Sequence, residues 1–214
     1  MGRSGSLRSV VLVTALCMLG GAAIGAEPPP GSDRIKALQA DPAKMHAAVE
    51  AGRSLATFCA NCHGESGVSK NQDVPNLGAQ NPAYLLEQIR KFGSGERKDQ
   101  FMQGLIKAMK EEERVQVAAY FSSQKVPAGK ADTALVARGK EFYVRLCARC
   151  HGEQAHGNET IPRLAGQQVE YLKKSIVRFR DGTGERNYTL MQIATAGLKN
   201  EDIPAIAAYL SSQP

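Results

Sequence analysis

Two copies of one five-residue pattern carry the most chemistry in this chain: Cys59-Ala60-Asn61-Cys62-His63 and Cys147-Ala148-Arg149-Cys150-His151. Two thiols three positions apart share one turn of a helix, where each can bond to a vinyl side chain of the same porphyrin. The histidine that follows directly can then ligate the iron from one face. The pattern therefore predicts two covalently bound c-type haems, attached through Cys59, Cys62, Cys147 and Cys150, with His63 and His151 as iron ligands.

Other chemistries use paired cysteines as well. Two such pairs could form a tetrathiolate zinc site, but Cys59 and Cys147 are 88 positions apart, far wider than the spacing of an ordinary zinc ribbon. A thioredoxin-like redox motif needs a neighbouring βαβ pattern, and no strand-rich run precedes either pair. Disulfides that close such short loops would be poor staples for a domain. Haem attachment is favoured over these three alternatives.

The first 26 residues have the pattern of a secretory signal peptide. Arg3 and Arg8 form a basic region, an apolar stretch runs from Val10 to Ile24, and small residues near Gly25-Ala26 suit cleavage. The apolar stretch is short for a membrane span, and no basic stop-transfer flank follows it. We therefore expect a cleaved signal and a mature chain without stable membrane insertion, with an uncleaved anchor as the alternative.

Export is consistent with the haem prediction, because c-type haem is attached outside the cytoplasm in bacteria. The expected location is therefore the periplasm. Cys17, the fifth cysteine, lies inside the signal, and Leu16 before it is not the small residue that a lipoprotein cleavage site requires. After the signal, residues 27–42 begin with Glu27-Pro28-Pro29-Pro30-Gly31 and are predicted as an N-terminal linker.

An internal repeat divides the rest of the chain into two domains. The copies are offset by 87 to 89 positions, and their closing segments, residues 118–124 and 207–213, agree almost letter for letter. Other matched pairs are Pro75-Asn76-Leu77 with Pro162-Arg163-Leu164, Tyr84-Leu85 with Tyr171-Leu172, Phe92 with Phe179, and Gly95-Glu96-Arg97 with Gly184-Glu185-Arg186. Lys125-Val126-Pro127-Ala128-Gly129 separates the copies as a short linker. The predicted domains are residues 43–126 and 127–214.

Helical periodicity recurs in both copies, and no convincing alternating strand is present. The predicted helices are Ala43–Phe58, Pro82–Phe92 and Glu111–Ser122 in the first copy, and Ala134–Leu146 and Val169–Phe179 in the second. The predicted architecture is therefore all-α, twice.

The repeat also selects candidates for the second axial ligand of each iron. Met191 is the only methionine after the second motif, and the local offset of 89 carries it back to Met102. Met109, the nearby competitor, falls opposite Leu198 and is predicted to be a core residue. Met102 and Met191 are therefore the predicted ligands, although an ordinary methionine at such a position is a core filler.

The remaining histidines do not correspond to one another in the repeat. His46 is expected at a solvated helix position and His156 on a surface loop, and Met45 has no methionine counterpart. Histidine and methionine together would close both irons to oxygen and peroxide. That coordination favours electron transfer over catalysis, so we do not expect an enzyme.

These residues resemble the class I cytochromes c and, over the full mature length, the diheme cytochrome c4 family. The two motifs with their following glycine, the Pro75 and Pro162 loops, Met102, Met191 and the closing segments carry the resemblance. It implies two tandem class I cytochrome c domains related by a pseudo-twofold axis, with haem propionates near the interface.

The resemblance also implies two details in each domain. The backbone carbonyls of Pro75 and Pro162 would accept a hydrogen bond from the histidine ring. Gly52 and Gly139 would let the first helix cross closely against the last, near Tyr120 and Tyr209. This sequence departs from strict repetition at Phe142, whose counterpart is Leu55, and in the loop after the first motif, which is one residue longer than its partner.

The formal net charge of +6 does not indicate a nucleic-acid partner, because no basic stretch interleaved with aromatic residues is present. A basic cluster in the second copy is either a solvated helix face or a docking patch for an acidic partner: Lys173, Lys174, Arg178 and Arg180.

Three functions from different classes follow. The favoured one is a soluble periplasmic carrier of single electrons between a membrane quinol-oxidising complex and a terminal oxidase. The second is the electron-accepting cytochrome subunit of a periplasmic dehydrogenase, for example a flavoprotein sulfide oxidiser. The third, a diheme peroxidase, needs one iron that can open to substrate, whereas both copies offer a methionine.

Overall fold

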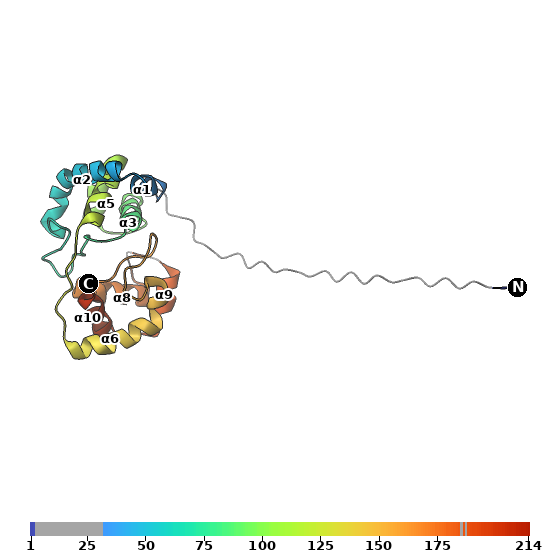
Figure 1. The fold of residues 1–214 in the computed structure, drawn as a ribbon. Helices are drawn as coiled ribbons and strands as arrows, with labels where there is room; N and C mark the ends of the chain where they lie inside the picture. Colours follow the sequence, from blue (N-terminus) through green and yellow to red (C-terminus); the bar gives the residue numbers. More distant parts are fainter. Residues whose placement is uncertain (3–31, 185, 187) are drawn as a thin grey trace.

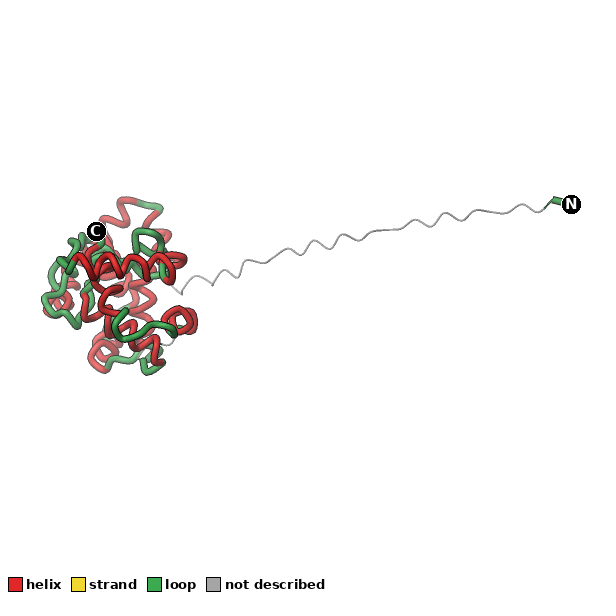
Figure 2. Tube along the Cα trace, turned by 90° about the horizontal axis from the view of Figure 1, so that it is seen from below, coloured by secondary structure: helices red, strands yellow, loops and turns green. Residues whose placement is uncertain are grey.

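The computed structural model describes residues 1–2, 32–184, 186 and 188–214 of the chain. The predicted signal peptide, Cys17, the polyproline segment and Glu185 lie outside the described residues. The described part contains ten helices and no strand, so the all-α prediction is confirmed (Figure 2). The helices are α1 (Ser32–Gln39), α2 (Pro42–His63), α3 (Pro82–Ser94), α4 (Gln100–Lys107), α5 (Glu111–Ser123), α6 (Thr133–Leu146), α7 (Ala148–His151), α8 (Val169–Asp181), α9 (Thr189–Thr195) and α10 (Ile203–Ser212).

The chain forms two stacked halves, with α1 to α5 in one and α6 to α10 in the other (Figure 1). Each half has its own hydrophobic core. Leu85, Leu86, Val115 and Phe121 belong to the first core, and Tyr143, Leu172, Ile206 and Leu210 to the second. None of the helices in the described part of the chain combines the length and apolar character needed to cross a bilayer.

The helix that leads into each haem motif begins at an aspartate cap. The Asp41 carboxylate accepts hydrogen bonds from the amides of Ala43 and Lys44 at 3.1 and 3.2 Å, and Pro42 occupies the first turn of α2. The Asp132 carboxylate accepts equivalent bonds from Ala134 and Leu135 at the start of α6. Both helices therefore start at fixed points and deliver their cysteines at defined positions.

Close helix crossings hold these helices against the last helix of each half. A Cβ atom added to Gly52 would lie 2.1 Å from the Gln116 carbonyl oxygen of α5, and one added to Gly139 would lie 2.0 Å from that of Ala205 in α10. Tyr120 and Tyr209 lie beside the two crossings, at 2.8 Å from the added atoms. The crossings that the resemblance implied are therefore present, and only glycine fits them.

The segment predicted as a linker differs from that prediction in its second part, where residues 32–39 form α1. Ile35 is only 1% exposed because it inserts into the core of the first half. Arg34 donates to the carboxylates of Glu111 and Glu112 at the start of α5. The linker prediction gave weight to the prolines before residue 32 and missed a single apolar anchor within a polar stretch.

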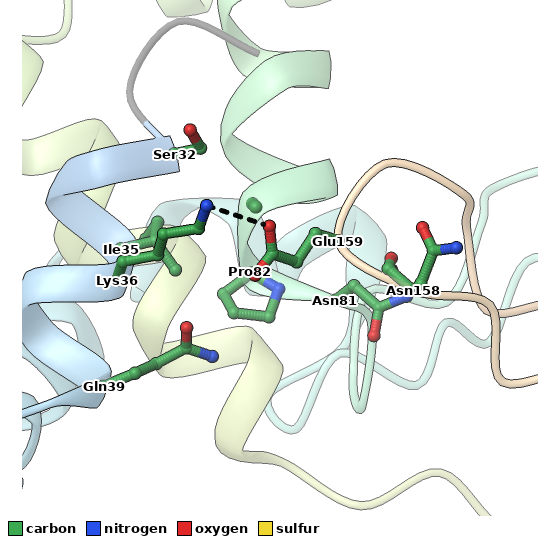
Figure 3. A pocket seen from close by; sticks show the side chains of 9 residues that line it. Ser32, Ile35, Lys36, Gln39, Asn81, Pro82, Asn158 and Glu159 are labelled. Atoms are coloured by element: carbon green, nitrogen blue, oxygen red, sulfur yellow. Dashed lines mark hydrogen bonds and ion pairs between the residues drawn. The ribbon is translucent and has the colours of Figure 1, made fainter. Parts of the chain in front are cut away.

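Helix α1 also reaches toward the second half. Its Lys36 lies 3.5 Å from the Glu159 carboxylate across a pocket of about 100 Å³ (Figure 3). The side-chain Nδ2 of Asn81, which lines the same pocket, donates to the carbonyls of His156, Asn158 and Ile161. This pocket contains no residue of either haem motif and serves as a seam between the halves.

Candidate haem sites

His63 ends α2 with a buried side chain whose Nδ1 lies 2.9 Å from the Pro75 carbonyl oxygen. Burial lowers the pKa of His63, so the ring is neutral at ordinary pH. A carbonyl can only accept, so Nδ1 carries the proton and donates it to Pro75. The Nε2 lone pair is therefore left available for a metal, which is the arrangement of a ligating histidine with an oriented ring.

His151 at the end of α7 repeats this geometry in the second half. Its Nδ1 lies 3.0 Å from the Pro162 carbonyl oxygen, and burial again lowers its pKa. The contact spans 11 positions here and 12 positions in the first half, which is the one-residue difference in loop length seen in the sequence. Both histidine–proline contacts that the resemblance implied are present.

The four motif cysteines have matched environments. Cys59 and Cys147 are half-buried, Cys62 and Cys150 are exposed, and all four thiols are free. Burial raises the pKa of Cys59 and raises that of Cys147 to about 11. The first cysteine of each motif therefore stays protonated at neutral pH.

The alternatives to haem attachment find no support in this arrangement. No disulfide joins the four motif cysteines. The described residues contain no cluster of three or more histidine, cysteine, aspartate or glutamate side chains that could hold zinc. A thioredoxin-like motif would require a strand before the helix, and the described part of the chain has none.

The two candidate methionines share one helical position. Met102 is the third residue of α4, and Met191 is the third residue of α9. The Asp99 carboxylate caps α4 by accepting from the Met102 amide at 2.9 Å. Met109, the competitor, packs against the hydrophobic core of the first half, as predicted. The structure thus keeps Met102 and Met191 equivalent, and their role as iron ligands stays a prediction.

The other histidines take the surface positions that the sequence predicted. His46 is exposed on α2, and His156 is exposed on its loop, where Nε2 lies 3.0 Å from the Pro214 carbonyl oxygen.

Most charges of the basic cluster on α8 have nearby acidic partners. Lys173 pairs with Glu170 at 2.9 Å, Lys174 with Asp73 of the first half at 2.7 Å, and Arg180 with Asp181 at 2.6 Å. This pairing favours a solvated helix face over a docking patch, because the charge available to a partner is reduced.

A group of basic residues at the interface was missed by sequence reasoning. The Arg97 guanidinium donates to Gln88 at 3.1 Å and to the Tyr171 hydroxyl of the other half at 3.3 Å, and Arg186 donates to the same hydroxyl. Burial and the charge of Arg186 lower the pKa of Arg97. The repeat had already matched Arg97 with Arg186, and this match was the available signal.

The charge of this group favours an anionic neighbour. Burial acts to raise the pKa of Tyr171, but the charges of Arg186 and Arg97 lower it to about 8. No carboxylate among the described residues forms an ion pair with Arg97, and the buried Nε of Arg163 has no hydrogen-bond partner there. Haem propionates are carboxylates, so these residues fit a haem group, with Arg97 and Arg163 as candidate holders of its acidic edge.

Similarity to known proteins shows to which class of protein this chain belongs. The family model described as cytochrome c matches the chain twice, over residues 49–125 and 136–214. A protein of Pseudomonas aeruginosa named cytochrome c4 is 35% identical over 179 residues, covering 77% of this chain and 89% of that protein. The crystal structure of reduced recombinant cytochrome c4 from Pseudomonas stutzeri is similar with a TM-score of 0.72 and 32% identity, covering 78% of this chain and 98% of that one. The chain therefore belongs to the cytochrome c family and, as a tandem of two such domains, to the cytochrome c4 family.

A relative with a different printed role is also similar. The thiosulfate dehydrogenase electron acceptor of Thiomonas intermedia is 30% identical over 174 residues, covering 74% of this chain and 80% of that protein. Two cytochrome c domains with two attachment motifs mean two covalently bound c-type haems. The protein is thus an electron-transfer cytochrome, as the sequence predicted.

Proposed function

We propose that this cytochrome is a periplasmic carrier of single electrons, with His63 and Met102 as ligands of one iron and His151 and Met191 as ligands of the other. Cys59 and Cys62 attach the first haem, and Cys147 and Cys150 attach the second. Bound haem supplies an iron that cycles between the ferric and ferrous states. The protein's contribution is to fix the ligands on both sides of that iron.

The observation that carries this proposal is the duplicated ligand geometry. Both histidines are buried and hydrogen-bonded at Nδ1, at 2.9 and 3.0 Å, and both methionines occupy the third position of a short helix. A thioether ligand raises the reduction potential, and a second ligand leaves no open position for a substrate. With both axial positions filled, neither iron would be open to peroxide, which favours a carrier over a peroxidase.

The proposed partners lie on either side of the carrier in a respiratory chain. A quinol-oxidising membrane complex would donate electrons, and a terminal oxidase would accept them. The proposed periplasmic location depends on the signal sequence pattern in residues 1–26. Two haems in one chain would permit a relay between the two partners or storage of two electrons.

The second candidate function is the electron-accepting cytochrome of a periplasmic dehydrogenase, such as a flavoprotein sulfide oxidiser. The similarity to the thiosulfate dehydrogenase electron acceptor favours this class of partner. Purification from the native host separates the candidates, because a stable, stoichiometric dehydrogenase would contradict the free carrier. Rapid peroxide turnover by the purified holoprotein would contradict both and favour a peroxidase.

Substitution of the methionines tests the proposed ligation. We expect Met102→Ala and Met191→Ala each to remove half of the thioether–iron charge-transfer absorption of the oxidised protein. Each should also lower one reduction potential, because axial ligands set haem potentials over a range of about 0.8 V. Met109→Ala is the matched control and should leave both bands intact. Full absorption in Met102→Ala together with loss in Met109→Ala would reassign the ligand to Met109.

A further inference from the structure

Two buried glutamines each hold one residue of the opposite half by its backbone. The Gln167 side chain accepts from the Asn76 amide at 2.7 Å and donates to the Asn76 carbonyl at 3.0 Å. The Gln80 side chain accepts from the Arg163 amide at 2.7 Å and donates to the Arg163 carbonyl at 2.8 Å. The two contacts are reciprocal, since the offset of 87 relates both the glutamines and the residues they hold.

The residue held in each half directly follows the proline whose carbonyl accepts the hydrogen bond from the motif histidine. The Pro75 carbonyl and the Asn76 amide belong to one peptide group, and the same is true of Pro162 and Arg163. One continuous series of hydrogen bonds therefore runs from the His63 ring through that peptide group to Gln167 in the other half. A second series of hydrogen bonds runs from the His151 ring through the Pro162–Arg163 peptide group to Gln80.

The glutamines are oriented before they meet the opposite half. The Gln80 Oε1 also accepts from the following amide, that of Asn81, at 3.0 Å, and the Gln167 Oε1 accepts from Gln168 at 2.9 Å. Gln80 is 7% exposed and Gln167 is 6% exposed, so water does not compete for these bonds. Each amide group therefore has one orientation, with its oxygen toward the peptide that serves the histidine.

We propose that Gln80 and Gln167 are crosswise positioning residues, each of which sets the electron-donating strength of the iron-ligating histidine in the opposite half. The inference deepens the proposed function and rests on it, because it takes His63 and His151 as iron ligands. It assigns to each domain a side chain that tunes the reduction potential of the other domain's haem.

The direction of the effect follows from the polarisation of an amide. A hydrogen bond donated by the amide N–H shifts electron density onto the carbonyl oxygen of the same peptide group. That oxygen then accepts more strongly from the histidine Nδ1–H, which makes the imidazole a stronger donor to the iron. A stronger donor favours the ferric state. Loss of either glutamine should therefore raise the reduction potential of the haem in the opposite half.

The test is a redox titration of the Gln167→Leu and Gln80→Leu holoproteins, followed through haem methyl proton resonances assigned to each half. We expect Gln167→Leu to raise the potential of the His63 haem and Gln80→Leu that of the His151 haem. The expected size is roughly a threefold change in the ferric-to-ferrous ratio at fixed potential, or about 30 mV at 59 mV per tenfold change. Shifts confined to the haem in the substituted half, or no shift at all, would overturn the inference.

Gln168→Leu is the matched control for loss of an interface contact. Its side chain donates across the interface to the Ser69 carbonyl at 2.6 Å and to the Asn76 side chain at 3.2 Å, without contacting a histidine-bound peptide group. We expect both potentials to stay unchanged in this variant. A shift as large as that of Gln167→Leu would mean that the interface as a whole, and not the glutamine contact, sets the potential, and the inference would fail.

A second substitution keeps the inference testable if a leucine variant does not fold. Gln167→Glu retains the oxygen that accepts from Asn76 and loses the donor to its carbonyl, so the His63 haem should not rise in potential. A rise in this variant would contradict the inference. The proposed function fails separately, through a haem content below two or the absence of the methionine band in the unsubstituted protein. Unchanged potentials in a protein with two haems and intact methionine bands refute the crosswise role alone.

Discussion

The two halves hold their equivalent motif histidines by partly different means. In the first half, α2 runs without interruption to His63, whereas in the second half the helix ends at Leu146 and restarts as α7 after Cys147. The Cys147 backbone, at φ −115° and ψ −37°, marks this break. The histidine–proline distances are nevertheless almost equal, at 2.9 Å in the first half and 3.0 Å in the second. The site geometry is therefore less sensitive to sequence change than the helix that carries it.

The loop after each motif is also held in both halves, by a tyrosine that comes from a different helix in each. In the first half, Tyr120 of the last helix donates to the Glu65 carbonyl at 2.9 Å. In the second half, Tyr143 of the first helix donates to the Gly152 carbonyl, and it occupies the position of Ala56 in the repeat. Its ring lies 5.2 Å from that of Tyr209, the counterpart of Tyr120. One alanine-to-tyrosine difference has moved the contact from the last helix to the first.

The largest effect should come from the feature that the halves share most closely, the glycine crossings. Gly52→Ala and Gly139→Ala would each press a methyl group against a backbone carbonyl at about 2 Å, which costs about 3 kcal/mol or more in free energy of unfolding. Chemical denaturation of the holoprotein measures this loss. Equal losses support equivalent scaffolds, and full stability in either variant contradicts the crossing in that half.

Gly104 provides the control for these glycine substitutions. It lies within α4, and no atom stands within 4 Å of a Cβ added there. Gly104→Ala should stabilise the protein by about 0.5–1 kcal/mol, because alanine loses less backbone freedom than glycine in a helix.

The second test concerns α1, which only the first half possesses among the described residues. Ile35→Ala would leave a cavity in the first core and should reduce the free energy of unfolding by about 2–4 kcal/mol. Thermal unfolding measures the stability of Ile35→Ala against that of a control, Val144→Ala. Val144 lies on α6 and is 62% exposed. A loss no larger than that of the control would mean that α1 does not stabilise the first half.

A smaller difference is expected between the matched tyrosines. Tyr120→Phe removes a hydrogen bond to the Glu65 carbonyl and should cost about 1 kcal/mol. The Tyr209 hydroxyl has no hydrogen-bond partner in the described part of the chain, so Tyr209→Phe should change stability by less than about 0.5 kcal/mol. Both side chains are 6% exposed, which makes the pair well matched. Equal effects in urea denaturation would show that the contact has not moved between helices.

The smallest effect concerns an acidic residue whose counterpart, Glu185, lies outside the described residues. Hydrogen bonds from Arg90 and Ser94 lower the pKa of Glu96 from an ordinary value of 4.5 to about 2. The unfolded chain therefore binds the extra proton between these pH values. The stabilising contribution is complete above pH 4.5 and is lost as the pH falls toward 2.

Glu96→Gln should consequently flatten the dependence of unfolding free energy on pH between 4.5 and 2. Denaturation curves across this interval measure the slope. Glu153→Gln is the control, because Glu153 is exposed and forms no ion pair with the described residues. An unchanged slope in Glu96→Gln would show that the Arg90 contact does not persist in solution.

Much of the fold could be predicted because each half presents strong local signals twice. Helical periodicity gave α2, α3, α5, α6 and α8 to within a few residues, apart from the continuation of α2 through the motif. The short helices α4 and α9 were not predicted, since eight and seven residues carry too little periodicity. Helix α1 was missed because one buried isoleucine in a polar segment gives no pattern.

In the candidate site, the residues that are close in the sequence could be predicted, and those that act through distant contacts could not. The cysteines and histidines are adjacent in the sequence, and the repeat selected by position the candidate methionines, whose ligation stays a prediction. Gln80, Gln167 and Arg97 act across the interface, and their partners lie 74 to 91 positions away. Pairwise contacts at such separations depend on how the halves stack, which neither composition nor periodicity specifies.

The reciprocal glutamine contacts have the form of an isologous interface, the kind formed by two copies of one subunit about a twofold axis. In separate subunits such an association would weaken on dilution. Here residues 124–132 join α5 to α6, so the pairing is intramolecular and has an effective concentration set by the linker. The two haem domains therefore stay paired at any protein concentration, and a partner that finds one of them has also found the other.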